Sequence, residues 1–74
     1  MNKNRDVAYL QNFGLRLKEL RLSKGYTQSL FADKCNIERS QIVRLEKGLI
    51  NPTILTLKIL ANTLEIDLQV LVSF

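Results

Sequence analysis

The chain has 74 residues, enough for one small hydrophobic core but not for a second domain. Its composition, 46% hydrophobic and 24% charged, is typical of a packed soluble domain, and no apolar run reaches the roughly 18 residues of a membrane span. A single cysteine, Cys35, and the absence of histidine exclude an internal disulfide and the usual zinc sites, while the net charge of +4 favours polyanionic partners. Because the first residues also lack the apolar region of a signal peptide, we expect a cytoplasmic protein. We expect no cofactor.

A first helix is predicted after a short polar segment. Residues 1–6, MNKNRD, show no apolar periodicity, so we interpret them as a flexible tail that precedes a single domain over residues 7–74. From about Val7 to Lys24, apolar residues recur at three- and four-residue intervals, which indicates an amphipathic helix. Gly25 then indicates the helix end, because glycine readily takes the left-handed conformation found there.

Four further helices complete the predicted all-α, five-helix fold. Thr27 is a good N-cap for a helix over residues 28–35, and Asn36 suits the turn behind it because asparagine tolerates a positive φ. The next helix, residues 39–47, ends at Gly48. Pro52 prevents it from continuing, and a fourth helix follows over residues 53–64, capped by Asn51 or Thr53. Asp67 can cap a short last helix in LQVLV.

Residues 28–47 have the pattern of a helix-turn-helix. Two helices that cross steeply need a small side chain where they approach, a turn that tolerates positive φ, and apolar side chains that face the core. These roles are filled in order by Ala32, by Asn36, and by Ile37, Ile42 and Leu45.

The helix predicted over residues 39–47 has one strongly basic face. On a helical wheel, Ile42 and Leu45 turn inward, and the opposite arc carries three positive charges and no negative one, whereas a solvated face more often mixes signs. Arginine can bind guanine through two hydrogen bonds, serine can donate a hydrogen bond to a base or accept one from it, and valine can contact the thymine methyl group. We therefore interpret this outer arc as a DNA-facing surface; it consists of Arg39, Ser40, Val43, Arg44 and Lys47.

With these elements in place, the chain resembles the Cro/C1-type helix-turn-helix family, also called the XRE family, of phage repressors and small bacterial regulators. The resemblance covers about residues 13–72 and rests on FG..LKELR..KGYTQ at 13–28, FA at 31, I..LEKG at 42–48, NPT..TL at 51–57 and LA..L at 60–64. It implies a five-helix, lambda-repressor-like domain.

The resemblance also implies roles for single residues. Positions matching Arg39, Ser40 and Arg44 commonly read bases, and Val43 joins them on the outer arc. Glu46 is expected to pair with Arg21 and so to fasten the first helix to the third. Contacts with DNA phosphates are expected from five residues, Thr27, Gln28, Gln41, Lys47 and Asn51, with Gln28 aided by the N–H groups and dipole of its helix.

Several residues depart from the family pattern. Glu38 occupies the cap position before the third helix and brings a negative charge close to the DNA, and Asn36 replaces the commoner glycine. Leu30, Ile59 and Val70 stand where polar residues are usual. Local core packing is one explanation for such residues; as a group they favour a dimer interface, for which we expect Ile59, Ile66, Leu68, Val70 and Phe74.

Together these patterns predict a regulator that binds double-stranded DNA sequence-specifically, as a homodimer on a palindromic operator, and acts as a repressor or controller. The alternative is an antitoxin-type module that neutralises a toxin and also regulates its own promoter. No catalytic constellation is visible, so we do not expect an enzyme. For Cys35, a small buried hydrophobe is favoured over a redox sensor.

Overall fold

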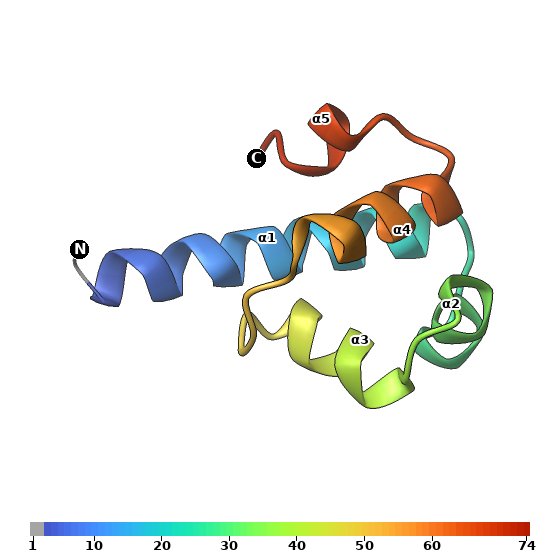
Figure 1. Ribbon diagram of the computed structural model, residues 1–74, viewed down its shortest axis with the longest axis horizontal. Coiled ribbons are helices and arrows are strands. Elements are labelled where there is room, and N and C mark those ends of the chain that lie inside the picture. The colour runs from blue at the N-terminus through green and yellow to red at the C-terminus, as the bar shows by residue number, and fades with distance from the viewer. Residues whose placement is uncertain (1–2) are drawn as a thin grey trace.

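The computed structural model describes residues 3–74, and within this range the chain forms five α-helices joined by short turns (Figure 1). Their bounds are α1 Lys3–Ser23, α2 Gln28–Cys35, α3 Arg39–Glu46, α4 Ile54–Leu64 and α5 Leu68–Leu71. The all-α, five-helix prediction is confirmed. Over the same residues, none of the helices is both long and apolar enough to cross a membrane.

The first helix starts earlier than its apolar pattern indicated. It begins at Lys3 instead of near Val7, so residues 3–6 of the expected tail are helical, while residues 1–2 lie outside the described part of the chain. This segment contains no glycine or proline, and Asp6 in the first turn interacts favourably with the helix dipole. Figure 1 shows these first turns projecting beyond the other helices. The apolar periodicity therefore begins only where the helix reaches the core.

Helices α1 to α4 all end in the same backbone turn. The residue after each helix, or one further on, is left-handed, with φ of 76° at Gly25, 57° at Asn36, 71° at Gly48 and 57° at Glu65. The N–H of the following residue then donates to a carbonyl five positions back, as from Tyr26 to Arg21. The predicted left-handed conformation of Asn36 is confirmed, whereas that of Glu65 was not predicted.

The helix starts are capped by two threonines. Thr27 Oγ1 accepts a hydrogen bond from the Leu30 N–H at 3.0 Å, and Thr53 Oγ1 accepts one from the Thr56 N–H at 3.1 Å. Thr53, and not Asn51, is therefore the cap of α4. Glu38 and Asp67 occupy the cap positions of α3 and α5, but their side chains make no capping bond.

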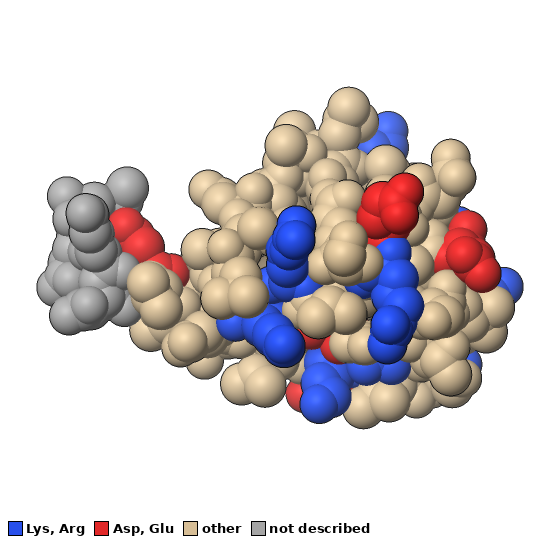
Figure 2. Space-filling view, turned by 90° about the horizontal axis from the view of Figure 1, so that it is seen from below, with Lys and Arg blue, Asp and Glu red and all other residues tan. Residues whose placement is uncertain are grey.

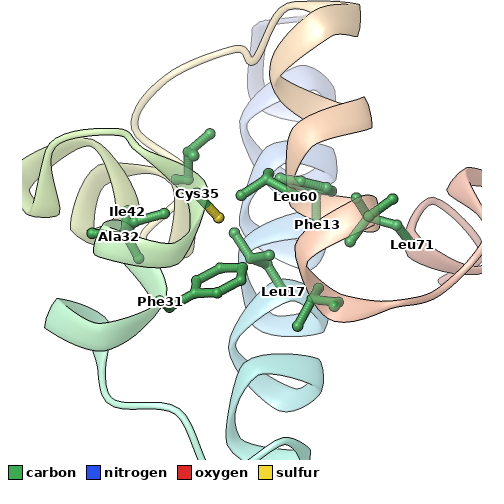
Figure 3. Close-up of a cluster of buried hydrophobic side chains, with 11 residues drawn as sticks. Phe13, Leu17, Phe31, Ala32, Cys35, Ile42, Leu60 and Leu71 are labelled. Atoms are coloured by element: carbon green, nitrogen blue, oxygen red, sulfur yellow. The ribbon is translucent and has the colours of Figure 1, made fainter.

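All five helices contribute to one hydrophobic core (Figure 3). Ala32, the small residue expected where α2 approaches α3, is 2% exposed, and Cys35 is only 5% exposed, which confirms its interpretation as a small buried hydrophobe. The α5 turn is also tied to α1, because Arg16 Nη2 donates to the Val70 carbonyl at 3.1 Å. The core consists of Phe13, Leu17, Phe31, Ala32, Cys35, Ile42, Leu45, Leu60, Ala61, Leu64 and Leu71.

Candidate nucleic-acid interface

A buried ion pair holds the third helix in place. Arg21 and Glu46 are 5% and 8% exposed, and their side chains meet through two hydrogen bonds, Nε to Oε2 at 2.6 Å and Nη2 to Oε1 at 3.0 Å. Arg21 Nη1 also donates to the Tyr26 carbonyl at 2.8 Å, in the loop before α2. The pair implied by the resemblance is thus present, and it joins α1, the α1–α2 loop and the end of α3.

Gln28, the first residue of α2, belongs to the same network. Its Nε2 donates to Glu46 Oε1 at 3.2 Å, so this half-buried side chain is oriented by the end of α3. An amide group has a second N–H donor, which leaves capacity for a phosphate oxygen. Gln28 lines a surface hollow with Thr27 and Lys18, an exposed cation on α1 that the sequence interpretation missed. Only the tertiary packing of α1 beside the start of α2 brings Lys18 there.

The outer arc of α3 is exposed as predicted from the helical wheel. Ile42 and Leu45 are fully buried, while Arg39, Ser40, Arg44 and Lys47 are exposed and Val43 is half-buried. These five outward residues line one shallow hollow, and Leu49 completes it from the loop behind α3. The structure therefore brings together the four residues predicted to contact bases and one of the five predicted to contact phosphates.

Basic side chains dominate the face that carries α3. Figure 2, which views the molecule from below relative to Figure 1, shows Lys and Arg gathered on this side. Glu46 is buried in its ion pair and presents little charge to solvent. Glu38 is exposed, yet it lines a separate hollow at the α2–α3 turn, together with Asp33. The acidic residue that departs from the family pattern is thus at the margin of the basic hollow.

Two other predicted phosphate contacts line hollows other than that of the outer arc. Gln41 is half-buried and lines the hollow at the α2–α3 turn with Glu38. Asn51 is exposed but lines a different, largely apolar hollow beside Tyr9 and Phe74. Neither residue lines the hollow of the outer arc.

The predicted dimer surface separates into two groups. Ile66 and Leu68 are half-buried and pack against the core, which is the local alternative considered for such residues. Ile59, Val70 and Phe74 are 37%, 37% and 46% exposed. The Phe74 ring also lies 5.0 Å from that of Tyr9, centroid to centroid. Exposed apolar surface is therefore present on α4, on α5 and at the end of the described chain.

Two short packed helices joined by a tight turn, an inward face that builds the core and a basic outward face define a helix-turn-helix DNA-binding domain. Residues 17–71 match the family model of the helix-turn-helix family HTH_3. The chain belongs to this Cro/C1-type, or XRE, helix-turn-helix family.

Two relatives are phage or prophage proteins of Bacillus. The chain is 34% identical over 59 residues to the immunity repressor protein of Bacillus phage phi105, covering 80% of this chain and 41% of that protein. It is 42% identical over 55 residues to the SPbeta prophage-derived uncharacterized HTH-type transcriptional regulator YonR of Bacillus subtilis strain 168, covering 74% and 51%. The chain thus spans about half, or less, of the length of these curated relatives.

Similar solved structures include two restriction-modification controller proteins. C.AhdI from Aeromonas hydrophila has a TM-score of 0.85 and 35% identity, with 88% of this chain and 94% of that chain covered. C.Esp1396I has a TM-score of 0.76 and 31% identity, with 86% and 87% covered. An HTH_3 family transcriptional regulator from Vibrio cholerae has a TM-score of 0.83 and 29% identity, with 89% and 37% covered.

Proposed function

We propose that this protein is a sequence-specific transcriptional regulator that binds a palindromic operator as a homodimer and acts as a repressor or controller. The observation that carries the proposal is the division of α3 into a fully buried face, with Ile42 and Leu45, and an exposed face that carries, with the cap residue Lys47, three cations. The names of the relatives, an immunity repressor and two controllers, support the direction of regulation.

In this proposal α3 lies in the major groove. Arg39 and Arg44 bind guanine edges, Ser40 pairs with a neighbouring base and Val43 approaches a thymine methyl group. Thr27, Gln28, Gln41, Lys47 and Asn51 bind phosphates around this helix. The fit of Gln28 rests on its bond to Glu46, which orients the amide before DNA arrives. These contacts position the domain, while the α3 contacts supply the specificity.

Dimerisation in this proposal uses the exposed apolar residues of α4 and α5, namely Ile59, Val70 and Phe74. A two-fold axis beside these helices would place two α3 helices about 34 Å apart, one turn of DNA, so that each reads one half of a palindrome. Sedimentation of the parent and of Val70→Glu tests this: we expect a dimer that the charge converts to a monomer. A parent that is monomeric at micromolar concentration would contradict dimerisation through this surface and would favour the antitoxin alternative, in which a toxin covers it.

Selection of binding sites from random double-stranded DNA tests DNA recognition directly. We expect an enriched palindrome, and on that site Arg39→Ala and Arg44→Ala should each cost about 1–3 kcal/mol of binding free energy. Lys58→Ala removes another exposed cation, from α4 and outside the outer arc, and serves as the matched control. If both arginine variants bind as tightly as the Lys58 variant, α3 is not the recognition helix.

The dependence of affinity on salt separates phosphate contacts from base contacts. Lys47→Ala should weaken binding to all sequences alike and reduce the slope of log K against log salt by about 1, because one fewer counterion is released. If the slope does not change, Lys47 does not contact a phosphate.

A further inference from the structure

Leu49 is an exposed apolar residue in the middle of a basic surface. Its side chain is 66% exposed, more than any residue of the core or of the proposed dimer surface. It lines the same hollow as Arg39, Arg44 and Lys47, and Val43 is the other apolar residue there. From the family resemblance, the loop over residues 47–53 is expected to lie along the phosphates, but no contact is predicted for Leu49 itself, because its proximity to the outer arc depends on how the chain turns after α3.

The other three helix ends with this turn show that the exposure of Leu49 is not a general property of the turn. The residue in the place of Leu49 is Tyr26 after α1, Ile37 after α2 and Ile66 after α4, and each of these is half-buried against the core. Such a hydrophobic residue usually packs back onto the end of its own helix. Leu49 has the same backbone bond, from its N–H to the Arg44 carbonyl at 2.9 Å, but it lies outside the core.

The backbone of Leu49 is therefore held in place while its side chain remains uncovered. Gly48 before it is left-handed and buried, and a Cβ there would overlap the backbone of Gln11 in α1, so the turn is fixed against the first helix. A side chain carried on such a turn has a defined position relative to α3. Its exposed apolar area is then available to a partner that also satisfies the neighbouring cations.

The charges around Leu49 determine which partner fits. An apolar protein surface would leave Arg39, Arg44 and Lys47 desolvated without partners, which is costly. The major groove of DNA presents phosphates and guanine acceptors to cations, and the thymine 5-methyl group is its apolar feature. We propose that Leu49 is a specificity-determining residue that packs, beside Val43, on a thymine methyl group of the operator half-site. This inference rests on the function proposed above.

The experiment replaces each thymine of the selected half-site, one at a time, by deoxyuridine, which removes only the methyl group. Dissociation constants are measured by fluorescence anisotropy for the parent, Leu49→Ala, Val43→Ala and a control, Leu15→Ala. Leu15 is 62% exposed on α1 and undergoes the same change in side-chain size. At one thymine we expect the uracil site to bind the parent about fourfold more weakly, since one buried methyl group contributes about this factor.

The result expected for Leu49→Ala is that its affinities for the thymine and uracil sites become equal, while the Leu15 variant keeps the fourfold difference. Equal weakening of Leu49→Ala on both sites would indicate a sugar or phosphate contact and would overturn the inference. So would a methyl effect that disappears only in Val43→Ala, or a half-site without any methyl effect. If no sequence is enriched from random DNA, the proposed function itself fails, and this inference fails with it.

Discussion

Gly14 in α1 packs directly against the backbone carbonyl of Glu46, so that a Cβ at Gly14 would overlap this group and would lie 2.6 Å from the carbonyl oxygen of Leu45. The two helices therefore touch backbone to backbone at the point where α3 ends. We expect Gly14→Ala to lower the free energy of unfolding by about 1–3 kcal/mol, because overpacking outweighs the roughly 1 kcal/mol that alanine gains in helix propensity. Urea unfolding followed by circular dichroism measures this change.

Gly25→Ala is the comparison variant, because its expected cost comes from the backbone conformation and not from overlap with neighbouring atoms. Nothing lies within 4 Å of a Cβ at Gly25, but φ is +76°, so the substitution is costly only through the backbone conformation. Gly25→Asn should recover most of the loss, since asparagine tolerates this conformation, whereas no side chain should be accepted at Gly14. A Gly14→Ala variant as stable as the parent would show that α1 and α3 can separate without cost.

Breaking the ion pair between Arg21 and Glu46 should be strongly destabilising. Both side chains are buried, so Arg21→Met or Glu46→Leu alone leaves an unpaired buried charge, and we expect each to cost about 3–5 kcal/mol. The double variant should lose less than either single one, because no buried charge remains. A double-mutant cycle of unfolding free energies gives the coupling; if the effects of the two single changes simply add, the pair does not act as a unit.

Replacing Glu65 should stabilise the domain. Glu65 is exposed, yet it holds a left-handed φ of 57°, which costs a non-glycine residue about 1–2 kcal/mol. Glu65→Gly relieves this strain and loses some of the gain to the greater freedom of the unfolded chain, so we expect a net increase of about 0.5–1 kcal/mol. Glu65→Ala keeps the strain and serves as the control. An equal effect of the two substitutions would mean that the conformation is not the cause.

The thiol of Cys35 should be unreactive in the native protein. Burial raises the pKa of Cys35 above its ordinary value of 9.0, and the Thr63 hydroxyl offsets this only in part. The thiol therefore stays neutral in the folded state, and it should react with Ellman's reagent at pH 8 far more slowly than it does in urea.

The same pKa shift has a consequence for stability. Because the folded-state pKa is the higher one, the contribution of Cys35 is complete below the pKa of the unfolded thiol and is lost as the pH rises through that of the folded thiol. Unfolding free energies of the parent should fall relative to those of Cys35→Ala above about pH 9. In the reactivity experiment, a native thiol that reacts with Ellman's reagent as fast as the thiol in urea would contradict the burial of Cys35.

The sequence features that correctly predicted helix boundaries and buried faces are local ones. Thr27, Gly25 and Asn36 each mark a helix boundary by the chemistry of one residue, and the structure confirms all three. The inward and outward faces of α3 also follow from residue spacing alone, because the buried positions Ile42 and Leu45 recur with the period of the helix.

Features that depend on distant parts of the chain could not be found in this way. Arg21 and Glu46 are 25 positions apart, and only the family resemblance indicated their pairing. Glu65 carries no signal for a left-handed turn, since it takes this conformation where the chain must turn to bring Ile66 onto the core. The exposure of Leu49 and the position of Lys18 likewise depend on how helices pack, which residue types alone do not specify.

The two faces of α3 have a consequence for how such proteins diversify. Residues that hold the helix in place, Ile42, Leu45 and Glu46, are buried, whereas Arg39, Ser40 and Arg44 make no contribution to the core. Exchanging exposed residues typically changes stability by no more than about 0.5 kcal/mol. Under the proposed function, new sequence preferences can therefore arise on an unchanged scaffold, and a duplicated copy can come to regulate other genes in the same cell without interfering with its parent.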